Sequence, residues 1–159
     1  MMSSLFAILL LQAAPAAAPA AAPVCTAAVA PPAGLEAWGA TSGTTADAID
    51  PGKATELTLQ SIAGVTFPLA PERKPADGTF GGVYHVAIAT AGTYRVALQN
   101  GAWIDLVRDG KSLTSIAHME GAPCSGIRKI VDFALQPGTY TLQLSGAKVA
   151  RIRALIATK

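Results

Sequence analysis

The fold is indicated by two matching stretches of sequence, AGTYRVAL at residues 91–98 and PGTYTLQL at residues 137–144. Each has a glycine, then Thr-Tyr, and then alternating apolar and polar side chains. A period of two places every second side chain on the same face of a β-strand, so both stretches are predicted to be antiparallel strands with one buried face. Tyr94 and Tyr140 begin these buried faces, and each hydroxyl is expected to bond a nearby backbone group, as in the tyrosine corner of other sandwiches.

The rest of the chain follows the same pattern of short strands separated by turns. Glycine and proline, which favour turns, recur every eight to twelve residues or so. Asp109-Gly110 is a strong hairpin signal between two of the segments. Further strands are predicted at residues 55–60, 65–69, 83–89, 103–108, 111–118, 127–135 and 151–157. The predicted fold class is all-β, an antiparallel two-sheet β-sandwich of the jelly-roll kind, with about eight or nine strands.

Period-two alternation also predicts the core. We expect the inward side chains to be Leu57, Leu59, Tyr84, Val86, Ile88, Tyr94, Val96, Leu98, Ile104, Leu106, Val131, Phe133, Leu135, Tyr140, Leu142, Leu144, Ile152 and Ile156. Trp38 precedes the first strand and is expected to close one end of the sandwich.

The start of the chain predicts export. Residues 5–11 form the apolar run LFAILLL, small residues follow it, and the run is shorter than the roughly 20 apolar residues that span a bilayer. We therefore predict a signal peptide at residues 1–20, with APA at residues 14–16 or at 18–20 as the cleavage site. An Ala/Pro-rich tether is predicted at 21–34 and a single β-sandwich domain at 35–159. The expected location is periplasmic or extracellular, with no membrane span after cleavage.

Two cysteines fit an exported chain. Cys25 and Cys124 are the whole complement, and the default in an oxidising compartment is a disulfide between them. This bridge would join the tether to the domain.

The charge of the chain is close to balanced. The formal net charge is +2, and no motif of a nucleic-acid reader is present, so no nucleic acid is expected as a partner. The expected partner is a cell-envelope glycan or protein.

Two groups of residues in the sequence are of types that can bind a metal ion or a ligand. His85, His118 and Glu120 supply the residue types of a two-histidine, one-carboxylate metal site, although their spacing does not require them to converge. Trp103 and Asp105 share the face of a strand opposite Ile104 and Leu106, an arrangement suited to stacking a sugar or a cation.

Four residues form the predicted ligand surface, and they are Trp103, Asp105, His118 and Arg128. The alternative is that Trp103 covers the core beneath the loop at residues 119–126. No catalytic residue, resident metal or cofactor is predicted.

Several motifs resemble those of a known family. PGK at 51–53, AGTY at 91–94, WIDLV at 103–107 and RDGKSL at 108–113 look like the bacterial pre-peptidase C-terminal β-sandwich. The resemblance implies a non-catalytic module that assists secreted enzymes in export, anchoring or substrate contact.

A second resemblance rests on GAWID at 101–105, CSGIRK at 124–129 and PGTYTLQ at 137–143. These stretches are similar to short exported bacterial proteins of unknown function, some of which carry the label homogentisate 1,2-dioxygenase. Enzymes of that family hold iron with ligands in the order His, Glu, His, whereas this chain offers His85, His118 and Glu120.

The leading hypothesis is a non-enzymatic, secreted or periplasmic module with a binding, accessory or structural role. The alternative is a metal-dependent, non-haem iron dioxygenase that uses His85, His118 and Glu120. A third is an envelope protein that contacts only other proteins.

Overall fold

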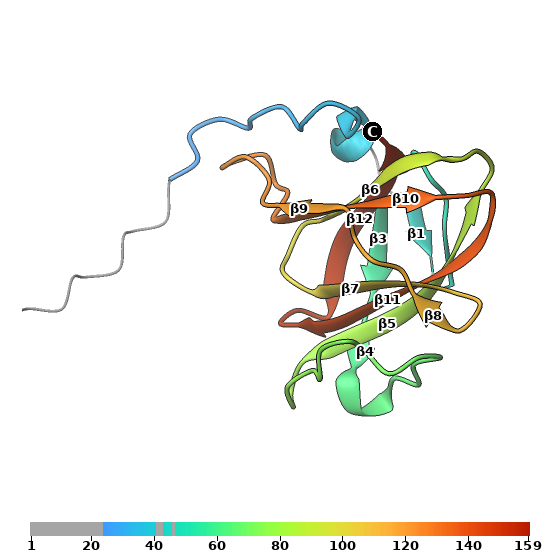
Figure 1. Ribbon diagram of the computed structural model, residues 1–159. Helices are drawn as coiled ribbons and strands as arrows, with labels where there is room; N and C mark the ends of the chain where they lie inside the picture. Colours follow the sequence, from blue (N-terminus) through green and yellow to red (C-terminus); the bar gives the residue numbers. More distant parts are fainter. Residues whose placement is uncertain (1–23, 41–42, 46) are drawn as a thin grey trace, which may run out of the picture.

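Two β-sheets packed face to face make up the protein (Figure 1). The computed structural model describes residues 24–40, 43–45 and 47–159, so the predicted signal peptide and the first residues of the tether lie outside the described residues. The described residues hold twelve strands and two short 3-10 turns, η1 (Glu36–Gly39) and η2 (Ile62–Gly64). The predicted all-β, two-sheet sandwich is confirmed. The strand number exceeds the prediction because five strands have only two or three residues.

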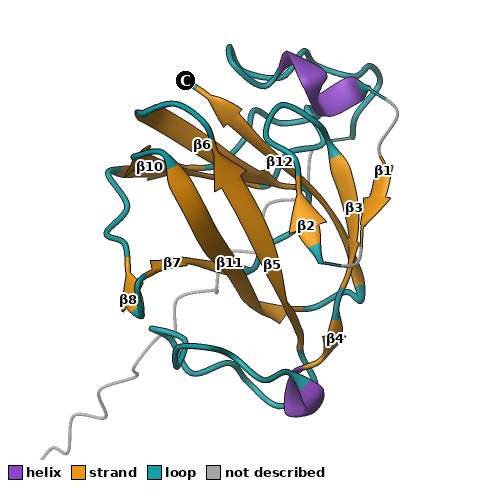
Figure 2. Cartoon of the chain, turned by 90° about the vertical axis from the view of Figure 1, so that its right-hand side faces the viewer, coloured by secondary structure: helices purple, strands orange, loops and turns teal. Residues whose placement is uncertain are grey.

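We name the sheets after their central strands. The β6 sheet has the order β1 (Gly43–Thr45), β3 (Thr55–Thr58), β12 (Arg151–Thr158), β6 (Gly92–Leu98), β10 (Lys129–Leu135) and β9 (Ala117–Met119). The β11 sheet has the order β2 (Ala48–Ile49), β5 (Phe80–Ile88), β11 (Gly138–Ala147), β7 (Trp103–Arg108) and β8 (Lys111–Ser112), and β4 (Gln60–Ser61) also pairs with β5. Figure 2 shows the long strands β5 and β11 side by side. Neighbouring strands are antiparallel except at two short pairs, β1 with β3 and β2 with β5.

The predicted core is confirmed, because every residue expected to face inward is buried in the cluster between the sheets. The expectation for Trp38 is wrong. It is 5% exposed in a second cluster with Leu35, Ile130 and Leu155 on the outer face of the β6 sheet. The β6 sheet carries apolar residues on both faces, so the segment before β1 covers its outer face rather than the end of the sandwich.

Both tyrosine corners form as predicted. The Tyr94 hydroxyl donates to the Thr90 carbonyl at 2.9 Å. The Tyr140 hydroxyl donates to the Gln136 carbonyl at 2.8 Å and accepts from the Gln136 N–H at 2.9 Å. A third bond reaches the Tyr140 hydroxyl from Nη1 of Arg108 at 3.0 Å. The second corner therefore joins the turn before β11 to β7.

The segment after the hairpin departs from the prediction. Asp109 and Gly110 have φ values of 52° and 70°, as the left-handed hairpin turn requires. The predicted strand at 111–118 is wrong. The chain pairs with β7 over β8, makes one more backbone bond from Leu113 to Leu106, and then crosses to the other sheet as β9. The run of Thr and Ser at 114–115 and the exposed Ile116 lie in the crossing.

The strand predicted at residues 65–69 is also wrong. This segment is irregular, and Pro68 deprives it of a backbone donor. Leu69 finds its partner in a side chain instead: Gln143 Oε1 accepts from the Leu69 N–H at 3.1 Å, and Gln143 Nε2 donates to the Leu69 carbonyl at 3.0 Å.

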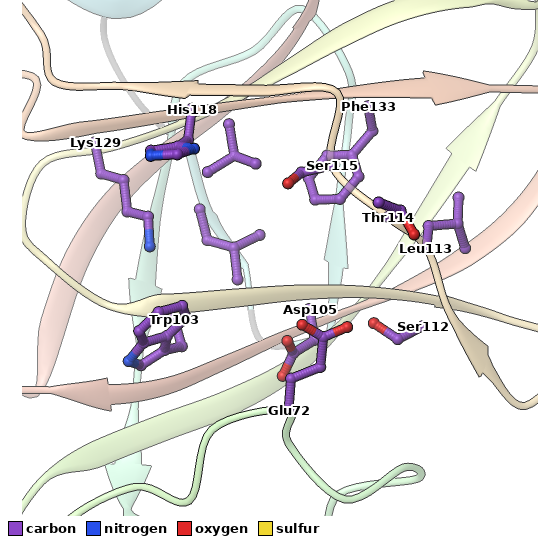
Figure 3. Close-up of a pocket in the computed structure, with 12 residues that line it drawn as sticks. Glu72, Trp103, Asp105, Ser112, Leu113, Thr114, Ser115, His118, Lys129 and Phe133 are labelled. Carbon is purple, nitrogen blue, oxygen red and sulfur yellow. The ribbon is translucent and has the colours of Figure 1, made fainter.

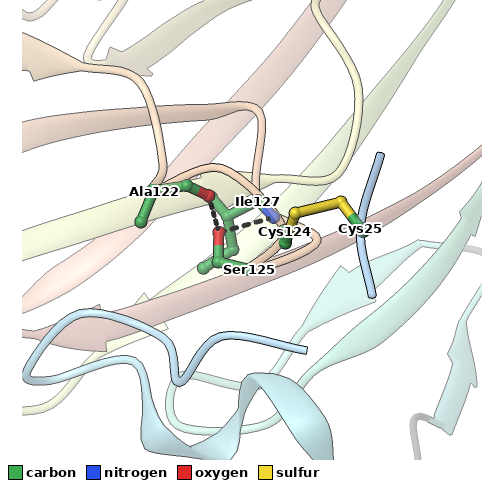
Figure 4. The surroundings of a disulfide bond; sticks show 5 residues. All are labelled: Cys25, Ala122, Cys124, Ser125 and Ile127. Atoms are coloured by element: carbon green, nitrogen blue, oxygen red, sulfur yellow. Dashed lines mark hydrogen bonds between the residues drawn. A yellow bond between two sulfur atoms is a disulfide. The ribbon is translucent and has the colours of Figure 1, made fainter. Parts of the chain in front are cut away.

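A disulfide joins Cys25 to Cys124, as the sequence predicts (Figure 4). Beside it, the Val29 N–H donates to the Cys124 carbonyl at 3.0 Å. Ser125 Oγ donates to the Ala122 carbonyl at 2.7 Å and accepts from the Ile127 N–H at 3.2 Å. The Ala/Pro-rich segment is therefore fastened to a loop that has its own internal bonds.

Replacing Tyr140 by phenylalanine should cost more than the same change at Tyr94. Tyr140→Phe leaves both backbone groups of Gln136 and one Arg108 N–H without their partner, so we expect a loss of about 1–3 kcal/mol in the free energy of unfolding. Tyr94→Phe removes one backbone bond and a longer contact of 3.3 Å with the Thr90 hydroxyl, which can turn to another partner, so a loss of about 0.5–1.5 kcal/mol is expected. Urea denaturation of both variants measures the difference, and equal losses would contradict the assigned roles.

Removing the disulfide should destabilise the fold without changing it. The bridged residues are 99 apart in sequence, and the chain-entropy model gives up to ~4.7 kcal/mol for a loop of this length. The double variant Cys25→Ser, Cys124→Ser should keep the circular-dichroism spectrum of a β-protein. Its midpoint of unfolding should move to a lower urea concentration. Thiol titration of the unfolded, unreduced protein should find no free thiol, and two titrating thiols would refute the bridge.

Candidate functional site

A cleft opens along the unpaired edge of β7. On one side Trp103–Val107 pair with β11, but on the other side β8 reaches only Val107 and Arg108. The cleft at this edge has a volume of about 480 Å³ (Figure 3). Its lining comes from both sheets and two loops, and consists of Glu72, Trp103, Ile104, Asp105, Ser112, Leu113, Thr114, Ser115, His118, Lys129, Val131 and Phe133.

The outer wall of the cleft is built by the irregular segment that follows η2. Leu69 is bonded to Gln143 on the outer face of β11. Three residues later the backbone of Glu72 bonds the Asp105 carboxylate, and the Arg73 guanidinium lies 5.0 Å from the centre of the Trp103 ring. These contacts cover polar side chains that alternate with core residues along β7 and β11.

Asp105 is the most unusual group in the cleft. It is 4% exposed, and its Oδ2 atom has no hydrogen-bond partner among the described residues. Burial raises the pKa of Asp105 above its ordinary value, and the neighbouring Glu72 carboxylate raises it further, while the Glu72 backbone bond and Lys129 oppose this rise. A buried, incompletely bonded carboxylate costs stability, and such costs are typical of sites kept for function.

Trp103 lies at the mouth of the cleft between cations. It is 39% exposed, so the alternative in which it covers the core is wrong. Lys129 Nζ lies 4.7 Å from its ring centre and donates to the Ala102 carbonyl at 2.9 Å. Figure 3 shows Lys129 reaching from β10 towards Trp103, with the carboxylates of Asp105 and Glu72 side by side.

The cleft brings together three of the four predicted ligand residues, which are Trp103, Asp105 and His118. The fourth, Arg128, points into a neighbouring hollow of about 430 Å³ that shares His118 and Lys129 with the cleft. There it pairs with Glu120 at 2.5 Å.

Sequence reasoning missed Lys129, Glu72 and Ser112. Lys129 had a readable signal, because it stands in phase with Val131 and Phe133 on the core face of β10. Burial lowers the pKa of Lys129, and the charge of Asp105 partly restores it. Glu72 lies in an irregular loop, and no periodicity could have placed it.

Serine, histidine and aspartate side chains meet in the cleft without forming a catalytic relay. Ser112 Oγ is buried and has no hydrogen-bond partner in the part of the chain that the structure describes, so it makes no bond to His118. A nucleophile activated by histidine is recognised by that bond. The arrangement offers binding groups rather than an assembled nucleophile.

The predicted metal ligands are not gathered. His85 is exposed on β5, two strands away from β7, whereas His118 belongs to β9 at the edge of the other sheet. Within the described residues, no group of three or more His, Cys, Asp or Glu side chains is placed to hold a metal ion. The donor set required by the dioxygenase alternative is therefore not assembled in this part of the chain.

Similarity to known proteins is found among solved structures. No protein-family model matches the chain, and no curated protein matches it. Among solved structures, the pre-peptidase C-terminal domain of a collagenase from Bacillus anthracis is similar, with 16% sequence identity, a TM-score of 0.43, and coverage of 73% of this chain and 98% of that one. None of the helices in the described residues has the length and hydropathy needed to cross a membrane.

Replacing Asp105 by asparagine should stabilise the protein at neutral pH. The raised pKa of Asp105 means that the folded state holds its proton more tightly than the unfolded state. Stability from this group is thus fully present below the ordinary carboxyl pKa of about 3.9 and is lost as the pH rises through the folded-state pKa. We expect Asp105→Asn to raise the free energy of unfolding by about 1 kcal/mol at pH 7 and to change it little at pH 4.

A second buried carboxylate provides the matched control. Asp132 is 0% exposed and is paired with Arg95 at 3.3 Å and Lys159 at 2.9 Å. Asp132→Asn removes the negative charge that pairs with these two cations, so we expect the free energy of unfolding to fall by about 3 kcal/mol. Urea denaturation at both pH values tests the contrast, and a destabilised Asp105→Asn at pH 7 would contradict it.

Proposed function

We propose that this chain is an exported, non-catalytic binding module that holds its ligand in the cleft at the edge of β7. The observation that carries the proposal is the Asp105 carboxylate. It is almost fully buried beside an exposed tryptophan, yet its Oδ2 atom has no hydrogen-bond partner within the described ranges. A few converging polar groups in a largely apolar concavity of this size are typical of ligand sites.

Two features support a location outside the cytoplasm. The Cys25–Cys124 disulfide is of the kind that persists in oxidising compartments. The apolar run at residues 5–11, followed by small residues, has the pattern of a secretory leader. The ligand expected in such a compartment is a cell-envelope glycan or protein.

A purely structural envelope role is the competing proposal. It would need only the exposed surface of the sandwich and would leave the cleft empty. Asp105 Oδ2 and the Ser112 hydroxyl favour the binding role, because neither buried atom has a hydrogen-bond partner among the described residues and a bound ligand would supply one.

Tryptophan fluorescence tests the binding role. The chain has two tryptophans, and Trp38 is 5% exposed whereas Trp103 is 39% exposed. A ligand in the cleft displaces water and shifts the nearby cations, so soluble cell-wall glycan fragments and envelope peptides should change the emission of Trp103. Trp103→Phe should abolish the change.

The control is Trp38→Phe, which should preserve the ligand-dependent change because Trp38 lies on the outer face of the other sheet. A response that survives in Trp103→Phe and disappears in Trp38→Phe would place binding elsewhere. No response to any probe would favour the structural role.

A further inference from the structure

The charges around the cleft indicate which kind of ligand group would complement the Asp105 carboxylate. None of the ion pairs among the described residues includes Asp105 or Glu72. Lys129 is the cation that acts on Asp105, but its ammonium group is bonded to the Ala102 carbonyl and lies over Trp103. The buried carboxylate therefore lacks a hydrogen-bond donor that carries a positive charge.

A divalent metal ion does not fit this gap. Calcium takes six to eight oxygen ligands or so, and magnesium demands a near-octahedral set. Asp105 and Glu72 supply two carboxylates, and the cations Lys129 and Arg73 stand close by on Trp103. A single positive charge with several N–H donors matches the site better than a hard dication does.

The rest of the cleft selects for an apolar stem behind that charge. Ile104, Leu113, Val131 and Phe133 line the same space as Asp105. An alkyl chain gains free energy when it leaves water for such a wall, while its charged head keeps polar contacts. Ser112 Oγ, also without a partner in the described residues, offers a second acceptor near the carboxylate.

From this juxtaposition we infer that the cleft binds a primary ammonium group on an unbranched aliphatic stem, with the ammonium at Asp105 and Ser112 and the stem along Ile104, Leu113 and Phe133. This inference rests on the proposed function and names the ligand chemistry of the same cleft. A free alkylamine and the side chain of a lysine in a partner polypeptide share that chemistry.

Binding is measured on the full chain by two-dimensional amide NMR, following the indole N–H of Trp103 and the backbone of residues 113–115. The probes are n-pentylamine, its neutral isostere 1-pentanol, and an acetylated, amidated Ala-Lys-Ala peptide with and without acetylation of the lysine amine. Both amines should shift these signals with millimolar affinity, as small fragments do. The two neutral probes should bind about tenfold more weakly or worse. Saturation by n-pentylamine alone identifies a small-molecule ligand, and tighter binding of the peptide identifies a polypeptide source.

Two variants, one that removes a negative charge from the cleft and one that removes a positive charge, distinguish an electrostatic effect on binding from a general loss of structure. Asp105→Asn should weaken amine binding at least about tenfold, whereas Lys129→Met, which removes the nearest competing cation, should strengthen it. Asp109→Asn is the matched control, because this exposed carboxylate lies in the hairpin turn outside the cleft. The affinity of this variant for n-pentylamine should equal that of the unchanged protein.

Two outcomes overturn the inference. Equal binding of 1-pentanol and n-pentylamine shows that the charge is not recognised. Glycan or neutral probes that shift the cleft signals while the amines do not would overturn the amine assignment and leave the proposed function standing. If neither amines nor glycans nor peptides move these signals, both proposals fall.

Discussion

One constraint governs the molecule: alternate residues of its six long strands must face a single shared core. Along β5, β6, β7, β10, β11 and β12 the inward positions are filled almost entirely by apolar side chains. The intervening residues are thereby forced onto the outer faces of the sheets, whatever their chemistry. Loops and terminal segments then cover those faces, and the polar groups that they bury need partners from the covering segments.

Two buried aspartates show how differently that need is met. On the outer face of the β6 sheet, Asp132 is held between Arg95 and Lys159. On the outer face of the β11 sheet, Asp105 receives a backbone bond from Glu72. Each carboxylate has one oxygen without a hydrogen bond among the described residues, but Asp132 forms two ion pairs and Asp105 forms none there. The contrast within one chain makes Asp105 informative, because burial alone does not explain it.

The parts of the structure that follow from period two were readable in the sequence. The inward faces of the long strands, the Asp109-Gly110 turn and both tyrosine corners depend on residues close together in the chain. The segment at 65–69 was not readable, because its backbone is bonded by the side chain of Gln143, 74 residues away from Leu69. Trp103 and Asp105 could be proposed from their shared strand face, whereas Glu72 joins them only through that irregular segment.

The wrongly predicted strand at residues 111–118 also explains why a cleft exists. Had this segment paired with β7 along its whole length, the edge of β7 at Trp103–Asp105 would be covered by a neighbouring strand. Instead the last backbone bond to β7 runs from the Leu113 N–H to the Leu106 carbonyl, and the chain joins β10 of the other sheet at Ala117. The crossing segment spans the opening between the sheets and contributes Leu113, Thr114 and Ser115 to the lining. The cleft therefore lies where the alternating pattern fails to form a continuous strand, because a fully paired edge would leave neither the space nor the unsatisfied atoms.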